Sequence, residues 1–301
     1  MSPEDPPARD AFGALLERAR ASVDARLGAW LRPRVAGATL VSAEVGAAAA
    51  AVEGLALRGG KRMRAALVGA GFEACGGGGM ERAELAMVAV ELLQVYLLIH
   101  DDWMDDDEVR RGGPAVHVQL RQRLGSKPLG DAAAVLAGDL ASAYAQEALL
   151  EVPLPPERVL AAARAFARIQ EEVVTGQLAE MHAVARAAKT PAPTVEQIHA
   201  LKTASYTVTG PLVLGASLAG ASDAVVAELE RYGRPLGVAF QLRDDLLGVF
   251  GDPSATGKPV WNDLRQGKRT ALVAELRGDE RAEALLSRVL GRPDASREDL
   301  E

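Results

Sequence analysis

The sequence predicts an all-α protein, and three observations lead to this prediction. Apolar residues recur at helical spacing in most long segments, and runs rich in Val, Ile and Thr are scarce. The 301 residues are 49% hydrophobic, 25% charged and 4% aromatic, which is a globular composition. No internal repeat and no low-complexity linker divides the chain. We therefore expect one domain over residues 1–301, built as a bundle of about ten or more helices.

Four helices are predicted in the first part of the chain, and residues that break helices separate them. The fourth is apolar on nearly every face, which is typical of a helix in the middle of a bundle. The four are Ala11–Leu31 before Pro33, Val41–Leu57 before Gly59 and Gly60, Arg62–Ala74 before Gly76–Gly79, and Met80–Asp102.

Seven further helices are predicted in the rest of the chain. Pro153 separates the first two, Gly210 and Pro211 end the third, and Ser222 is a candidate N-cap of the fourth. The last two are more charged and are expected to pack less securely. The seven are Ala132–Leu150, Pro156–Ala188, Ile198–Thr207, Asp223–Tyr232, Leu236–Val249, Thr270–Arg277 and Arg281–Leu290.

Charge, cysteine content and the N-terminal sequence argue against several classes of protein. Lys and Arg number 34 and Asp and Glu number 41, and the net charge of −7 argues against a general nucleic-acid binder. Cys75 is the only cysteine, which excludes an internal disulfide and a cysteine-based zinc site. The N-terminus lacks the basic and apolar regions of a secretory signal, and we expect no membrane span. We therefore expect a cytoplasmic protein.

Two acid clusters give the strongest chemical signal, and each follows an apolar helical stretch. The first contains Asp101, Asp102 and Asp105; at about 100° per residue, Asp101 and Asp105 lie about 40° apart on one helix face. Repelling carboxylates on one face are unfavourable unless a cation neutralises them. A solvated charge run is the alternative interpretation, but acids at a helix C-terminus oppose the helix dipole. The second cluster is the pair Asp244 and Asp245.

The acid clusters predict a magnesium site, and the basic residues predict phosphate binding beside it. Carboxylate ligands without His or Cys suit Mg²⁺, which keeps waters and binds substrate phosphates. The chain has only six lysines beside 28 arginines, and lysine is a compact charge suited to phosphate oxygens. Arg110 and Arg111 directly follow the first acid cluster. Four lysines stand in conspicuous places: Lys61, Lys202, Lys258 and Lys268.

Six short motifs occur in a fixed order: Gly59-Gly60-Lys61-Arg62-Met63-Arg64, Asp101-Asp102-Trp103-Met104-Asp105, Gly176-Gln177, Lys202-Thr203, Phe240-Gln241-x-x-Asp244-Asp245 and Gly257-Lys258. Together they resemble the trans-isoprenyl diphosphate synthases, or polyprenyl synthetase family, from about Ala51 to Thr270. The resemblance implies the isoprenoid synthase fold, a single-domain multi-helix bundle around a central cavity, in a homodimer. It also implies head-to-tail prenyl transfer from an allylic diphosphate to isopentenyl diphosphate.

The resemblance also implies roles for individual residues. Asp101 and Asp105 would hold Mg²⁺ with the allylic diphosphate, supported by Asp102, and Asp244 would hold a further ion, with three ions in all. The diphosphate-binding residues would be Arg110, Lys202 and Lys258 for the allylic substrate, Lys61, Arg64, Gln94 and Arg111 for isopentenyl diphosphate, and Lys268 as a further cation.

Thr203 and Gln241 would turn oxygen atoms toward the developing carbocation. Tyr206 is similar to a family tyrosine near the reacting centre, although a core role is the stronger interpretation. Gln94 has the alternative interpretation of a hydrogen-bonded polar residue in the core.

The position of Tyr96 predicts a short-chain product. Leu97 and Tyr96 lie four and five residues before Asp101, or about 6 and 7.5 Å along the helix. In the family, a bulky residue five before this motif acts as a floor that limits the growing chain. One aromatic followed by a leucine favours geranylgeranyl over farnesyl diphosphate. Packing of Tyr96 in the interhelical core, with the floor elsewhere, is the alternative.

The chain departs from the family pattern at several positions. Gly248 stands where a third acid of the second motif is common, Glu180 stands where Asp is frequent, and Ala65 replaces a usual proline. Family members also commonly continue through further C-terminal helices beyond the position of Glu301, so we expect a short or truncated C-terminus.

Two other functions are compatible with parts of the sequence. A class I terpene cyclase would share the fold and the metal chemistry, but it would lack the segment that begins with Gly59. A non-catalytic partner subunit of a heteromeric synthase would lose its acid motifs, whereas this chain keeps Asp101, Asp102 and Asp105.

Overall fold

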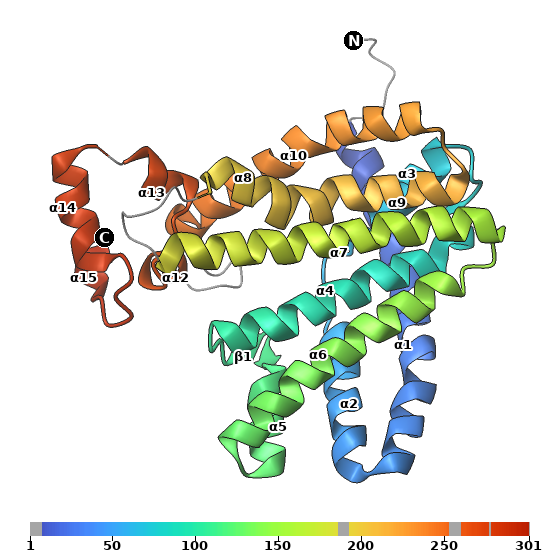
Figure 1. Ribbon diagram of the computed structural model, residues 1–301, viewed down its shortest axis with the longest axis horizontal. Helices are drawn as coiled ribbons and strands as arrows, with labels where there is room; N and C mark the ends of the chain where they lie inside the picture. The colour runs from blue at the N-terminus through green and yellow to red at the C-terminus, as the bar shows by residue number, and fades with distance from the viewer. Residues whose placement is uncertain (1–7, 186–192, 253–259, 277, 301) are drawn as a thin grey trace. The chain divides into compact units, whose positions relative to one another are not determined.

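The computed structural model describes residues 8–185, 193–252, 260–276 and 278–300, and these residues form two compact units. Unit 1 comprises residues 8–166 and 211–227, and unit 2 comprises the described residues of 167–210 and 228–300. Both units are built from helices, which confirms the all-α prediction (Figure 1). Within the described residues the only strands are β1 (Val109–Arg110) and β2 (Gly113–Pro114), an antiparallel pair.

Unit 1 is organised around α4 (Glu84–Met104), as the apolar sequence of that helix predicts. Every residue from Leu85 to Val95 is buried. Helix α6 packs along α4 (Figure 1) and presents small buried residues such as Ala134 and Gly138. The other elements are α1 (Ala8–Val41), α2 (Ala43–Leu57), α3 (Met63–Ala74), η1 (Met80–Ala83), α5 (Val116–Leu124), α6 (Lys127–Leu150), the start of α7 (Pro156–Ala185), α9 (Gly210–Ala219) and the start of α10 (Asp223–Phe250).

The stretch Met80–Met104, formed by η1 and α4, is long and apolar enough to cross a membrane. However, 72% of its most apolar window is buried inside the protein. The core helix of a soluble protein has the same length, composition and burial, so this stretch is weak evidence for a membrane span.

Two prolines lie inside continuous helices, although the sequence predicts that a helix ends before Pro33 and that two separate helices flank Pro235. Helix α1 continues through Pro33, and α10 continues through Pro235, which joins the two helices predicted at Asp223–Tyr232 and Leu236–Val249. A proline inside a helix removes one backbone hydrogen bond and costs about 3 kcal/mol. The helical residues on both sides keep the rest of the hydrogen-bond ladder, so the helix survives that cost.

Unit 2 contains a π-helix, η2 (Ala200–Thr209), where the sequence predicts an α-helix at Ile198–Thr207. A Cβ on Gly176 of α7 would lie 2.5 Å from the backbone nitrogen of Lys202, so a glycine is needed where α7 meets η2. The other elements of unit 2 are α8 (Val195–His199), the rest of α7 and α10, α12 (Asn262–Arg265), α13 (Ala271–Glu275), α14 (Glu280–Val289) and α15 (Arg297–Leu300).

Candidate active site

The first acid motif occupies the last turn of α4. The backbone N–H of Asp105 donates to the carbonyl of Asp101 at 2.9 Å, so the helical hydrogen bonding continues through Asp105. The two residues are therefore one turn apart, as the spacing predicts, and both are half-buried. Asp102 lies on another face of the helix and is fully buried.

Asp102 forms an ion pair with Arg110 across the loop that follows α4. Arg110 Nε donates to Asp102 Oδ1 at 2.6 Å, and Arg110 Nη2 lies 3.2 Å from Asp107 Oδ2. Burial raises the pKa of Asp102 to about 6, although the hydrogen bond and charge of Arg110 act in the opposite direction. Asp102 Oδ2 is buried without a hydrogen-bond partner among the described residues. A further cation close to this oxygen would stabilise the ionised carboxylate.

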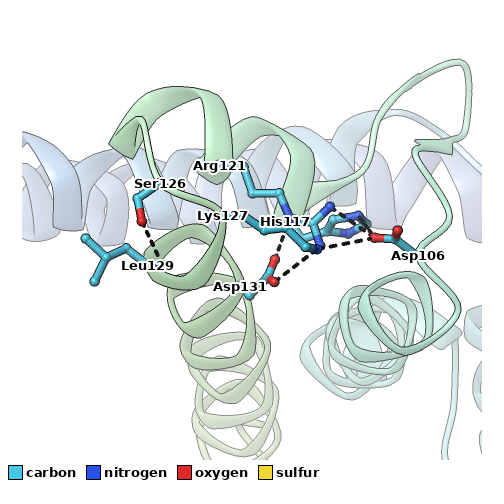
Figure 2. Close-up of polar contacts among 7 residues, drawn as sticks. All are labelled: Asp106, His117, Arg121, Ser126, Lys127, Leu129 and Asp131. Atoms are coloured by element: carbon cyan, nitrogen blue, oxygen red, sulfur yellow. Dashed lines mark hydrogen bonds and ion pairs between the residues drawn. The ribbon is translucent and has the colours of Figure 1, made fainter.

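Asp106, the residue after the first acid motif, belongs to a cluster of charged side chains that the sequence does not predict. Asp106 has a positive φ of 52°, and its Oδ1 accepts from Arg121 Nη1 at 3.0 Å and lies 3.9 Å from Lys127 Nζ (Figure 2). Arg121 also donates to Asp131 at 2.5 Å. His117 Nε2 lies 3.7 Å from Asp106, and burial lowers the pKa of this histidine, which favours its neutral form. The cluster links the end of α4 to α5 and to the first turn of α6.

Strands β1 and β2 place Arg111 in a tight turn. Arg111 and Gly112 have φ values of 51° and 70°, and positive φ at both central residues is typical of a type I′ hairpin. Arg58, the C-cap residue of α2, donates to the carbonyl of Arg110 at 2.9 Å. Arg111 Nη1 donates to the carbonyl of Leu55 at 3.3 Å. The hairpin is therefore anchored on the C-terminal end of α2.

Arg62 fixes the glycine-rich loop from inside the protein. Its φ is 50°, and its side chain donates to Asp24 Oδ1 at 2.7 Å, Glu91 Oε2 at 2.8 Å and the Ala56 carbonyl at 2.8 Å. These acceptors belong to α1, α4 and α2. The neighbouring Lys61 is exposed. The buried Arg62 thus joins three helices and leaves Lys61 at the surface.

Arginine side chains gather between this loop and the hairpin. A Cβ on Gly60 would lie 3.4 Å from Arg111 Nη2, so the two segments are in contact. Burial lowers the pKa of Arg111; the charge of Glu91 raises it, and the charges of the neighbouring arginines at 62, 64 and 110 lower it. Like charges at close range are unfavourable unless an anion joins them. This part of unit 1 therefore has the electrostatics of an anion-binding site.

Residues of the later motifs form a hydrogen-bonded chain in unit 2. The Thr203 hydroxyl donates to Gln241 Oε1 at 2.6 Å, and Gln241 Nε2 donates to Asp245 Oδ1 at 2.7 Å. The backbone N–H of Ala271 donates to Asp245 Oδ2 at 3.3 Å, and His199 Nε2 lies 3.3 Å from the same oxygen. Asp245, the second residue of the predicted acid pair, is buried and forms the end of this series of hydrogen bonds.

The remaining predicted residues of unit 2 have different surroundings. Lys202 pairs with Glu180 of α7, and Asp244 is exposed on α10. Tyr206 is half-buried on η2. The predicted role of Lys258 lies outside the described residues.

An acid lies beside Gly248, the position that departs from the second motif. A Cβ on Gly248 would lie 3.2 Å from Asp263 Oδ2, and Lys268 Nζ lies 3.8 Å from Asp263 Oδ1. Sequence spacing alone does not reveal this neighbour, because Asp263 belongs to the short helix α12.

The residues that precede the first acid motif lie on α4, as the helical spacing predicts. Gln94 is buried, whereas Tyr96 and Leu97 are half-buried. The Tyr96 ring contacts the His100 ring edge-on, with centroids 4.7 Å apart and an interplanar angle of 64°. The imidazole of His100 is therefore in direct contact with the Tyr96 ring.

The donor set at the end of α4 fits a hard divalent cation. In the part of the chain that the structure describes, no three side chains of His, Cys, Asp or Glu gather closely enough to hold a metal ion by themselves. Magnesium completes its shell with waters and substrate phosphates and needs only one or two carboxylates. The half-buried Asp101 and Asp105, with the unpartnered Oδ2 of Asp102 in the same turn, meet that need.

Comparisons with known proteins agree with these features. The profile of the polyprenyl synthetase family matches residues 47–301. Geranylgeranyl diphosphate synthase of Saccharolobus solfataricus is 36% identical over 247 residues, which are 81% of this chain and 71% of that protein. The (2E,6E)-farnesyl diphosphate synthase of Mycobacterium bovis is 41% identical over 211 residues, which are 70% of this chain and 55% of that protein.

Solved structures show the same fold. A crystal structure of geranylgeranyl pyrophosphate synthase from Corynebacterium glutamicum, complexed with isoprenyl diphosphate and magnesium, matches with a TM-score of 0.85 and 34% identity. The match covers 95% of this chain and 84% of that one. The predicted isoprenoid synthase fold is confirmed. The chain belongs to the polyprenyl synthetase family of prenyltransferases.

Proposed function

We propose that this chain condenses an allylic diphosphate with isopentenyl diphosphate, with Mg²⁺, and releases geranylgeranyl diphosphate, or farnesyl diphosphate as the shorter alternative. The allylic C–O bond breaks, the double bond of isopentenyl diphosphate attacks the carbocation, and a proton leaves. Negative charge develops on the departing pyrophosphate, so groups that neutralise it lower the barrier. The observation that carries the proposal is the Asp102–Arg110 pair in the turn that bears Asp101 and Asp105.

Asp101 and Asp105 would hold magnesium, and Asp102 would support them from the buried side of the turn. Asp244 would hold a further ion, so that three ions accompany the diphosphate. When bound, magnesium would supply Lewis-acid stabilisation of the diphosphate oxygens. The orphan oxygen of Asp102 supports this assignment, because its ionised form gains from a nearby cation.

The cations would bind the two diphosphates. The electrostatics of the arginines beside Gly60 support an anion site there, and the exposed Lys61 is free of the buried contacts that hold Arg62. Arg110 uses only part of its five N–H donors on Asp102 and Asp107. We assign Lys61, Arg64, Gln94 and Arg111 to isopentenyl diphosphate, Arg110, Lys202 and Lys258 to the allylic diphosphate, and Lys268 as a further cation.

Thr203 and Gln241 would act on the carbocation. The Thr203 hydroxyl donates its hydrogen to Gln241, so the oxygen keeps lone pairs that can face a positive centre. Asp245 accepts from the amide of Gln241 and thereby sets which way that amide points. Tyr96, with Leu97 beside it, would be the floor that stops the growing chain.

We also propose that the chain is one domain that forms a homodimer and works in the cytoplasm. Domain boundaries usually fall in exposed linkers, whereas two crossings between the units lie within the continuous helices α7 and α10. Light scattering after gel filtration would give the mass of the assembly. A monomer at micromolar concentration would contradict the homodimer.

The experiment that tests the function is incubation with Mg²⁺, isopentenyl diphosphate and each allylic starter, followed by dephosphorylation and sizing of the products. One dominant short prenyl alcohol is expected. Asp101→Asn should lower the rate by about 100-fold. Asp223→Asn, a change of an exposed acid in the first turn of α10, is the matched control. Folded protein that condenses no starter would point to a partner subunit, and a cyclic product formed without isopentenyl diphosphate would point to a cyclase.

A further inference from the structure

The imidazole of His100 occupies a space that Gly138 leaves open. A Cβ on Gly138 would lie 2.3 Å from His100 Nε2 and 2.4 Å from its Cδ2. Both distances are far below van der Waals contact, so a larger residue at position 138 displaces the ring. Gly138 is buried on α6, the helix that packs along α4.

Groups of α6 hold the imidazole in that space. His100 Nε2 lies 3.0 Å from the carbonyl oxygen of Val135, and because a carbonyl only accepts, this nitrogen carries the hydrogen. The same nitrogen lies 3.7 Å from Asp139 Oδ1. A displaced ring loses the hydrogen bond to Val135, so the position of His100 depends on the residue at position 138.

Tyr96 depends in turn on His100. The two residues are one turn apart on α4, and their rings meet in the edge-to-face geometry that aromatic pairs prefer. Tyr96 is therefore supported by α6 through the imidazole, and not only by its own helix.

We propose that Gly138 and His100 are positioning residues that set the length of the product. The inference rests on the proposed function, since it takes Tyr96 to be the floor for the growing chain. Gly138 determines where the imidazole lies, and the imidazole determines where the Tyr96 ring lies. A change on α6 therefore alters the product without touching a diphosphate or a metal ligand.

A double-mutant cycle tests this chain of contacts. Gly138→Ala displaces the imidazole that contacts the Tyr96 ring without removing bulk, so the ratio of shorter to longer products changes by about fivefold or more. His100→Ala removes the support of Tyr96, so the product shifts to longer chains. In the His100→Ala background the new Cβ at position 138 no longer meets the imidazole, and Gly138→Ala then leaves the distribution unchanged.

Two further variants make the outcomes separable. Gly54→Ala, also inside a helix but with nothing within 4 Å of its Cβ, should leave the product unchanged. Tyr96→Ala should lengthen it. If Tyr96→Ala lengthens the product and Gly138→Ala is silent, or acts equally in both backgrounds, the inference is overturned and the floor stands. If Tyr96→Ala is silent, the floor itself is wrong and the inference falls with it.

Discussion

The protonation of a single residue, Asp102, is coupled to folding. Its pKa is about 6 in the folded protein against the ordinary 3.8, mainly because the carboxyl is buried. The folded state therefore binds this proton more tightly than the unfolded chain does. The stabilisation is complete below about pH 4 and is lost as the pH rises through 6.

The first prediction follows from that sign. Between pH 7.5 and pH 5, protonation of Asp102 should raise the free energy of unfolding by about 1 kcal/mol. Urea unfolding with a chelator at both pH values, on wild type and Asp102→Asn, measures this. The pH-dependent gain should be smaller in the variant by that amount, whereas the exposed Asp294→Asn should keep it. Equal gains in all three proteins would contradict the prediction.

The second prediction concerns the buried pair of Arg62 and Glu91, which are 2% and 4% exposed. Glu91→Gln removes one of the two carboxylates that contact Arg62 and leaves the buried guanidinium paired with Asp24 alone, so it should cost about 2 kcal/mol of unfolding free energy. Replacing both partners, as in Arg62→Met with Glu91→Leu, should cost less than Glu91→Gln alone. Urea unfolding measures both, with the exposed Glu17→Gln as control. If Glu91→Gln costs less than about 1 kcal/mol, the Arg62 guanidinium is not held in a buried ion pair with Glu91.

At the residue scale, the sequence predicted the acid turn but not its supports. The spacing of Asp101 and Asp105 suffices because one helical turn joins them, from the end of α4 to its C-cap residue Asp105. Glu91 did give a signal, since it is the only charged residue between Glu84 and Asp101 and a charge in an apolar helix needs a buried partner. The partner itself was not predictable, because Arg62 reaches it only through the tertiary packing.

At the element scale, the π-helix η2 packs closely against α7 and α10 because both helices carry a glycine at the point of contact. Gly176 lies against the backbone of Lys202, and Gly237 of α10 lies against Ala204, where its Cβ would be 2.4 Å from the Cα. Two helices therefore present bare backbone to η2. Because η2 carries both Lys202 and Thr203, its position sets the position of those side chains.

The third prediction tests this close approach. Gly176→Ala should shift η2 and lower kcat/KM at least tenfold, because a misplacement of about 1 Å in a site can cost 100-fold. Steady-state kinetics measures the loss, and circular dichroism checks that the helices are retained. Gly37→Ala, where nothing lies within 4 Å of the new Cβ, is the control and should keep full activity. Activity of the Gly176 variant within twofold of wild type would contradict the prediction.

Helix existence was easier to predict than helix ends or helix type. The apolar runs of α2, α3 and α4 were recognised within a few residues. Pro33 misled the prediction because one missing hydrogen bond does not end a long helix, and the break expected between Tyr232 and Leu236 is absent for the same reason. The π-helix and the hairpin at Arg111 were missed because both depend on backbone dihedrals that composition does not encode.

At the scale of the whole molecule, the fourth prediction is that magnesium and pyrophosphate stabilise the protein more together than either does alone. Magnesium and inorganic pyrophosphate together should raise the melting temperature by about 5 °C at concentrations well above Kd, because they bind the folded state alone. Each component alone should give a smaller shift. Differential scanning fluorimetry measures this, and Asp105→Asn should abolish the joint effect while Asp223→Asn keeps it. Equal shifts in Asp105→Asn and wild type would contradict the metal assignment.

The whole-molecule prediction succeeded for fold class and family, whereas the single domain stays a prediction. Helical periodicity and ordered motifs suffice for the all-α class and for the family. No linker or change of composition marks the boundaries of the units, since α7 and α10 each contribute residues to both. Only the tertiary contacts reveal the grouping.

The buried ion pair of Arg62 and Glu91 ties the glycine-rich loop to α4. Glu91 lies ten residues before Asp101 on α4, which is about 15 Å along the helix axis at 1.5 Å per residue. Two substrates bound to the loop and to α4, one beside Lys61 and one beside Asp101, would keep a nearly constant separation. The two reacting carbons must come within about 3.5 Å of each other. Because the entropy of aligning the two sites is already lost when the protein folds, the effective molarity of the bound substrates would be high.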